Sequence, residues 1–144
     1  MTEMTREEIR RFLGHGTFTG KLATVRKDGS PHVAPVWFVL DENSNDDIIL
    51  TTSHESVKGK CIIRDPRVSI SVDDQKTPYS FVIVNGIAQI SEESSDLLKW
   101  ATKIAERYMG RDNAESYGKR NSVKGELLIR VKPTKTIGQK DIAL

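Results

Sequence analysis

The sequence predicts a mainly β protein of the α+β class, an antiparallel β-barrel of six or so strands with helices packed against it. Three observations support this fold class. Short β-branched and apolar runs alternate with turn residues, few segments have a helical stripe, and the run from His32 to Leu40 is apolar on both faces. The 144 residues lie within the usual length of one domain, so we expect a single domain over residues 1–144.

The first predicted element is a short helix near the N-terminus. Thr5 and Glu8 have the spacing of a capping box, and an apolar stripe follows as far as Leu13. Gly14 is expected to end this helix in the left-handed conformation.

A β-hairpin is expected next, because two apolar runs flank an Asp-Gly turn. The first run extends from Thr17 to Val25 and the second from His32 to Leu40. A strand that is apolar on both faces must be covered on both, as in a barrel or at a subunit interface. Pro35 cannot donate a ladder hydrogen bond, so the second strand is expected at a sheet edge or with a bulge.

The middle of the chain predicts three strands and one helix. Asp65-Pro66 stops the helix, and Gly86 marks a bulge or sharp bend in the third strand. The expected ranges are a strand from Ile48 to Thr52, a helix from Ser53 to Arg64, and strands from Arg67 to Val72 and from Tyr79 to Ile90.

The last third of the chain changes pattern. A helical stripe begins near Ser95, and Gly110 is expected to cap its end. The segment from Arg111 to Lys124 is polar and lacks a core pattern, which indicates a mobile excursion from the fold. Glu126 to Lys132 is the last expected strand.

Composition excludes several classes of protein. No apolar run approaches the roughly 20 residues that span a bilayer, and the N-terminus is polar and acidic, so we expect a soluble, cytoplasmic protein. A net charge of +2 and 6% aromatic residues do not favour nucleic-acid binding. The three histidines lack metal-ligand spacing, and the single cysteine, Cys61, is interpreted as a buried small apolar residue.

The segment from Thr51 to Lys60 has the residue types of a phosphate site. It places hydroxyl groups, a histidine and two lysines where a strand ends and a helix begins. A helix N-terminus carries unpaired N–H groups and attracts phosphate, to which Ser53, Ser56 and Lys58 would add hydrogen bonds and charge. The alternative is that Ser53 is only an N-cap and the lysines are solvated. Trp37 has two similar alternatives, flanking a planar ring or packing in the core.

Several segments together resemble the split-barrel superfamily of pyridoxamine 5'-phosphate oxidases, and most closely its small deazaflavin-dependent reductases. The similarity covers residues 16–91 well and rests on Gly20 to Val25, Asp28 to Phe38, Lys58 to Lys60 and Arg64 to Ser69. The resemblance implies a split β-barrel that binds a flavin or deazaflavin at the interface of a homodimer.

The resemblance also implies where the cofactor binds. The ring would lie along the second strand of the hairpin, and the phosphate at the turn before the helix. The expected cofactor-binding residues are His32, Val33, Ala34, Pro35, Val36, Trp37, Thr51, Thr52, Ser53, Ser56, Val57, Lys58 and Lys60.

This chain departs from the flavin mononucleotide (FMN) oxidases of the superfamily in its charge. Ser56 and Lys58 match the family's turn, but His32, Trp37 and Val57 stand where those oxidases carry basic residues. A phosphate monoester carries about −1.5 to −2 charges, whereas the phosphate diester of coenzyme F420 carries one. The sequence therefore favours coenzyme F420, with FMN as the alternative.

Two further expectations follow from the resemblance. The anionic tail of coenzyme F420 would meet Lys60, Arg64 or Arg67, and the absence of a C-terminal Arg-Leu-x-Pro motif argues against vitamin B6 oxidation. We expect an oxidoreductase that transfers a hydride between coenzyme F420 and an electron-poor small molecule, with no catalytic residue identifiable. The alternatives are an FMN-binding oxidoreductase of the same family and a barrel that binds or sequesters a cofactor without catalysis.

Overall fold

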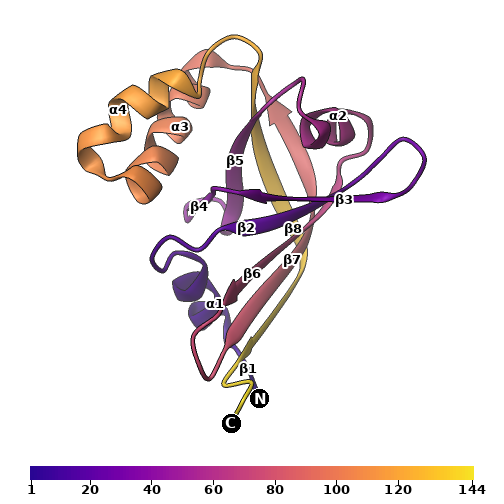
Figure 1. The fold of residues 1–144 in the computed structure, drawn as a ribbon, viewed down its shortest axis with the longest axis vertical. Helices are drawn as coiled ribbons and strands as arrows, with labels where there is room; N and C mark the ends of the chain where they lie inside the picture. The colour runs from indigo at the N-terminus through magenta and orange to yellow at the C-terminus, as the bar shows by residue number, and fades with distance from the viewer.

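A computed structural model describes residues 1–144 as an α+β fold of one antiparallel sheet and four helices (Figure 1). The strands follow the spatial order β3-β2-β6-β7-β8-β5-β4, with β1 pairing β8, and both chain termini lie at the same end of the molecule. The elements are β1 (Thr2–Glu3), α1 (Arg6–Leu13), β2 (Gly20–Val25), β3 (Pro31–Val36), β4 (Val39–Asp41), β5 (Asp47–Ser53), α2 (Val57–Arg64), β6 (Arg67–Asp74), β7 (Ser80–Ser91), α3 (Ser94–Met109), α4 (Arg111–Arg120) and β8 (Glu126–Lys140). No helix has both the length and the apolar character needed to cross a membrane.

The N-terminal helix forms as predicted, except at its end. The Thr5 side chain accepts a bond from the Glu8 backbone N–H and the Glu8 carboxylate accepts one from Thr5, so both halves of the capping box are present. Gly14 has a φ of −89°, in the right-handed region, so the predicted left-handed cap was wrong. Its N–H bonds the carbonyl groups of Arg10 and Phe12, which closes the helix without a left-handed residue.

The apolar run from His32 to Leu40 forms two strands rather than one. β3 pairs with β2 as far as Val36, and β4 begins at Val39 and pairs with β5 instead. The break falls at Trp37 and Phe38, because the backbone groups of Phe38 bond to side chains of α3 rather than to a strand. β3 lies at the edge of the sheet, which confirms the prediction from Pro35.

Two other boundaries differ from the prediction, and one predicted irregularity is present. α2 begins at Val57 and is capped by Ser56, so Ser53 ends β5 and is not the N-cap. The last strand continues to Lys140, eight residues beyond its expected end, as the long partner of β7. The predicted bulge at Gly86 is present, because the β7–β8 register shifts between Asn85 and Gly86.

The segment from Arg111 to Lys124 is not an excursion. It contains α4, whose buried Ala114 and Gly118 pack on α3. A Cβ atom on Gly118 would lie 2.2 Å from the Thr102 hydroxyl, so the two helices are in close contact there. Small residues therefore form this helix interface, and they leave no apolar stripe that a pattern search could find.

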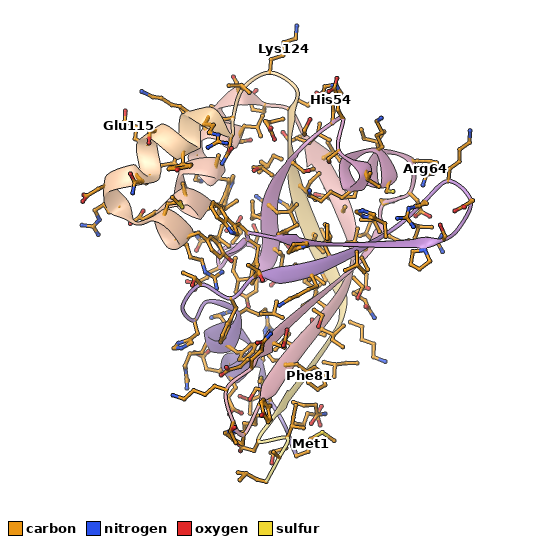
Figure 2. All side chains as sticks on the ribbon, viewed as in Figure 1. Met1, His54, Arg64, Phe81, Glu115 and Lys124 are labelled. Atoms are coloured by element: carbon orange, nitrogen blue, oxygen red, sulfur yellow. The ribbon has the colours of Figure 1, made fainter.

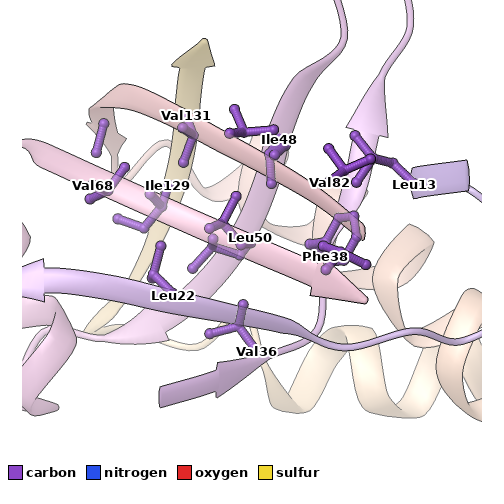
Figure 3. Close-up of a cluster of buried hydrophobic side chains, with 14 of the residues drawn as sticks. Leu13, Leu22, Val36, Phe38, Ile48, Leu50, Val68, Val82, Ile129 and Val131 are labelled. Atoms are coloured by element: carbon purple, nitrogen blue, oxygen red, sulfur yellow. The ribbon is translucent and has the colours of Figure 1, made fainter. Parts of the chain in front are cut away.

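Two hydrophobic clusters form the core. The larger fills the interior between the sheet and α1, and includes Leu22, Phe38, Leu50, Ile129 and Val131 (Figure 3). The smaller joins α3 to β5 and β8 through Ile49, Leu97, Trp100 and Leu128. Cys61 is buried as predicted.

Candidate functional site

A cavity of about 550 Å³ opens beside the ends of β3 and β5, where α2 and the α3–α4 pair approach the sheet. Its volume lies within the usual range for small-molecule and cofactor sites. One side carries hydroxyl groups and charges, and the other carries apolar and aromatic atoms. The lining residues are Thr19, Pro35, Val36, Trp37, Thr51, Thr52, Ser53, Lys58, Ile104, Asn121 and Glu126.

The polar side of the cavity is held by a hydrogen-bonded turn between β5 and α2. The Ser56 hydroxyl donates to the Ser53 carbonyl (2.8 Å) and accepts from the Gly59 N–H (3.0 Å). It also lies 2.8 Å from the Thr52 hydroxyl, which can donate to its remaining lone pair. Ser56 thus positions the turn, and its hydroxyl has no remaining donor for a ligand.

Gly59 allows the first turn of α2 to approach β5. A Cβ atom at this position would lie 2.3 Å from the Ser53 carbonyl oxygen, closer than real atoms come. The absence of a side chain therefore places Lys58 beside the end of β5, where it lines the cavity. Lys58 is the only cationic residue among the lining residues.

Glu126 is the only carboxylate in the lining. It begins β8 and pairs with Ser53 in the sheet register. Burial raises the pKa of Glu126 above its usual value, and the charges of Lys58 and His54 oppose this shift. Because neither Lys58 nor Glu126 forms a salt bridge within 4.0 Å, both remain available to a ligand.

The aromatic wall of the cavity is Trp37, whose ring stacks on Tyr108 of α3. The two ring centroids are 5.0 Å apart and the planes differ by only 3°. The Tyr108 hydroxyl donates to the Phe18 carbonyl (2.7 Å), and burial raises the pKa of Tyr108. Because Tyr108 is fixed in this way, Trp37 presents a flat, 38% exposed indole to the cavity.

A family model described as pyridoxamine 5'-phosphate oxidase matches residues 5–140. The chain belongs to this family. A comparison with curated protein sequences gives no match.

Solved structures of the same split-barrel fold include proteins of different kinds. A conserved hypothetical protein from Mycobacterium tuberculosis is 28% identical, with a TM-score of 0.83 over 98% of this chain and 89% of that one. An F420 reductase is 26% identical, with a TM-score of 0.67 over 88% of this chain and 94% of that one. The haem storage protein HutZ from Vibrio cholerae is 20% identical, with a TM-score of 0.71 over 92% of this chain and 94% of that one, which shows the fold alone.

The split barrel brings seven of the thirteen predicted site residues to one cavity. Hydroxyl-bearing, apolar and cationic residues from three elements meet there, although they are separated in sequence. These residues are Pro35, Val36, Trp37, Thr51, Thr52, Ser53 and Lys58.

The other six predicted residues lie outside this cavity. Val57 and Lys60 line a second cavity of about 600 Å³ on the other side of α2, and Ser56 is the N-cap described above. Val33 is 63% exposed on the outer face of the sheet. His32 pairs with Thr24 across β2 and β3, and the buried His32 Nδ1 and Thr24 Oγ1 atoms lack hydrogen-bond partners. Ala34, half-buried, is the sixth.

Four lining residues were missed by the sequence analysis: Thr19, Ile104, Asn121 and Glu126. Ile104 and Asn121 reach the cavity only because α3 and α4 pack beside it, which no local pattern indicates. Glu126 could have been found, since a carboxylate at the start of an apolar strand is an unusual residue there.

Proposed function

We propose that this protein is an oxidoreductase that binds coenzyme F420 in the cavity between β3, β5 and α2. The observation that carries the proposal is the charge of the lining: one lysine, hydroxyl groups and one carboxylate beside a flat aromatic wall. When bound, the reduced deazaflavin supplies a hydride to an electron-poor small molecule. The role of the protein is to bind the cofactor, orient its ring and exclude water.

The charge of the polar side favours a phosphate diester. A phosphate monoester carries about −1.5 to −2 charges near neutral pH, and FMN has such a group. A single lysine opposed by a nearby carboxylate neutralises a dianion poorly, whereas one positive charge is sufficient for a diester. FMN is therefore the alternative cofactor and coenzyme F420 the preferred one.

The second cavity offers a place for the anionic tail of coenzyme F420. Arg26 and Lys27 from the β2–β3 turn face Lys60 and Arg64 of α2 across it, and Figure 2 shows Arg64 between that turn and the helix. Asp28 also lines the cavity, but its carboxylate already accepts bonds from Ser30. Arg26 and Arg64 each donate to a backbone carbonyl group, which leaves their charges unneutralised. Arg67 instead bonds the Asp65 carboxylate with two nitrogens and lines a different cavity.

We also propose that the protein acts as a homodimer through the outer face of the sheet. The register places Pro35, Ile83 and Ile137 in one row across the strands, and Val33 lies in the neighbouring row. Val33 and Ile137 are exposed in the single chain, as apolar residues at subunit interfaces are before assembly. Light scattering is expected to give twice the chain mass of 16.2 kDa, and a monomer at micromolar concentration would refute the dimer.

The decisive experiment is a binding titration of the purified protein with coenzyme F420 and with FMN. We expect tighter binding of coenzyme F420, and tighter binding of FMN would contradict the charge argument. Lys58→Ala is expected to weaken binding about tenfold to a hundredfold, because a hydrogen bond to a charged group contributes about 1.5–3 kcal/mol. Lys60→Ala, on the other side of α2, is the matched control and should weaken binding less.

The same titration distinguishes the proposed function from the remaining alternatives. Equal, negligible effects of Lys58→Ala and Lys60→Ala would mean that the turn before α2 binds no phosphate. Binding of coenzyme F420 without reduction of any electron-poor acceptor would favour a protein that sequesters the cofactor.

A further inference from the structure

Glu126 is an unexpected residue in a cavity that is to hold an anion. Glu126 lines the same cavity as Lys58, and its carboxyl group accepts no hydrogen bond and forms no salt bridge that would give it a structural role. Its register partner is Ser53, whose carbonyl is already used by Ser56. A carboxylate placed there adds a negative charge close to the proposed phosphate position, which is unfavourable for every anionic ligand.

We infer that Glu126 determines which cofactor the cavity accepts, by discriminating against ligands whose phosphate carries two negative charges. The inference rests on the proposed function and names the residue that sets its specificity. Lys58 attracts the phosphate, Glu126 repels it, and the balance favours a monoanionic diester over a dianionic monoester. Selectivity by repulsion of the wrong ligand is a common way for proteins to discriminate between similar partners.

The physical basis is that the Coulomb energy between Glu126 and a phosphate at a given distance increases linearly with the charge of that phosphate. Whatever factor Glu126 costs a monoanion, it costs a dianion the square of that factor, and it costs a ligand without a phosphate nothing. Charges that face Glu126 change the size of the factor but not this scaling. The ionisable neighbours are Lys58 of α2 and His54 of the β5–α2 turn.

The scaling can be measured with Glu126→Gln, which removes the charge and retains the shape of the side chain. Three probes are titrated into wild type and variant at pH 8, where the FMN phosphate is a dianion: riboflavin, coenzyme F420 and FMN. Interactions between charges in a partly exposed cavity are weak, so we expect about threefold tighter binding of coenzyme F420 to the variant. The gain should be about tenfold for FMN and absent for riboflavin.

The matched control is Glu55→Gln, which removes a negative charge from the turn between β5 and α2. The Glu55 side chain is 79% exposed and does not line the cavity. It should change the affinity for all three probes by less than twofold. If Glu55→Gln changed the ligand affinities as much as Glu126→Gln does, the change would be a general effect of net charge, and the inference would be overturned.

Two other results would also overturn the inference. Equal gains for coenzyme F420 and FMN would mean that Glu126 does not sense ligand charge. Weaker binding of all three probes, riboflavin included, would mean that Glu126 accepts hydrogen bonds from ligand hydroxyl groups. The proposed function has its own test, which fails if wild type binds FMN more tightly than coenzyme F420. The two tests are independent, because the inference about Glu126 compares variant with wild type for one ligand at a time.

Discussion

Arg107 connects α3 to the barrel by hydrogen bonds, and its replacement is expected to cause a large decrease in the free energy of unfolding. Its guanidinium donates to the carbonyl groups of Phe38 (2.7 Å), Leu13 (2.8 Å) and Gly16 (3.0 Å), and more weakly to His15 (3.3 Å). No carboxylate pairs with it, and burial lowers its pKa. One side chain therefore joins the end of α1, the loop that follows it and the break between β3 and β4.

The size of the effect follows from these bonds. A hydrogen bond to a charged group contributes about 1.5–3 kcal/mol, but bonds that share one guanidinium are not additive. We expect Arg107→Met, which keeps the aliphatic part, to lower the free energy of unfolding by about 3 kcal/mol. With an unfolding entropy of about 2.1 cal/mol/K per residue, a chain of this length should lose about 10 °C in Tm.

Urea unfolding and calorimetry measure this change directly. Arg107→Lys is the informative companion, because an ammonium group keeps the charge but cannot reach three carbonyl groups in the fork geometry of Arg107. It should be intermediate in stability. A Tm loss of less than about 2 °C for Arg107→Met would refute this account, because water would then satisfy the same carbonyl groups equally well.

Two further predictions concern Gly59 and Glu8. Gly59→Ala should lower the free energy of unfolding by about 1–3 kcal/mol, since the new Cβ would overlap the Ser53 carbonyl. Gly14→Ala should change the free energy of unfolding little, because the atom nearest to its new Cβ lies 3.6 Å away. Equal urea midpoints for the two variants would contradict this. The Lys140 ammonium bonds the Glu8 carboxylate and holds the pKa of Glu8 at about 2. This contact therefore stabilises the fold above pH 4.5, and the stabilisation is lost as the pH falls towards 2. Glu8→Gln should therefore flatten the fall in urea midpoint across that pH range, and an unchanged slope would refute the contribution of Glu8.

Local signals in the sequence correctly predicted the features that depend on only a few neighbouring residues. The capping box at Thr5 and Glu8 and the bulge at Gly86 are formed by short-range or single-residue requirements, and both are present. Pro35 indicated an edge strand, because a missing N–H excludes a central one. These requirements act within a few residues, so no knowledge of the tertiary fold was needed.

Long-range packing decided the parts that sequence reasoning missed. The split at Trp37 and Phe38 depends on bonds from Arg107 and Tyr108, about 70 residues away in the chain. α4 has no apolar stripe, because its contact with Thr102 is made through Gly118. For the same reason, Asn121 and Glu126 were not expected in the cavity: their position depends on how separate elements meet.

The two hydrophobic clusters described above imply that the protein does not open as one unit. The lining residue Val36 belongs to the large barrel core, whereas Ile104 and Asn121 belong to the α3–α4 pair. This pair is attached to the barrel by the small cluster around Trp100 and by Arg107. A segment held by few apolar contacts exchanges its amide hydrogens through local opening, at a lower free energy than global unfolding. The amides of α4 should therefore exchange well before those of β7 and β8. We therefore expect a bulky ligand to enter the cavity from the α3–α4 side while the barrel stays folded.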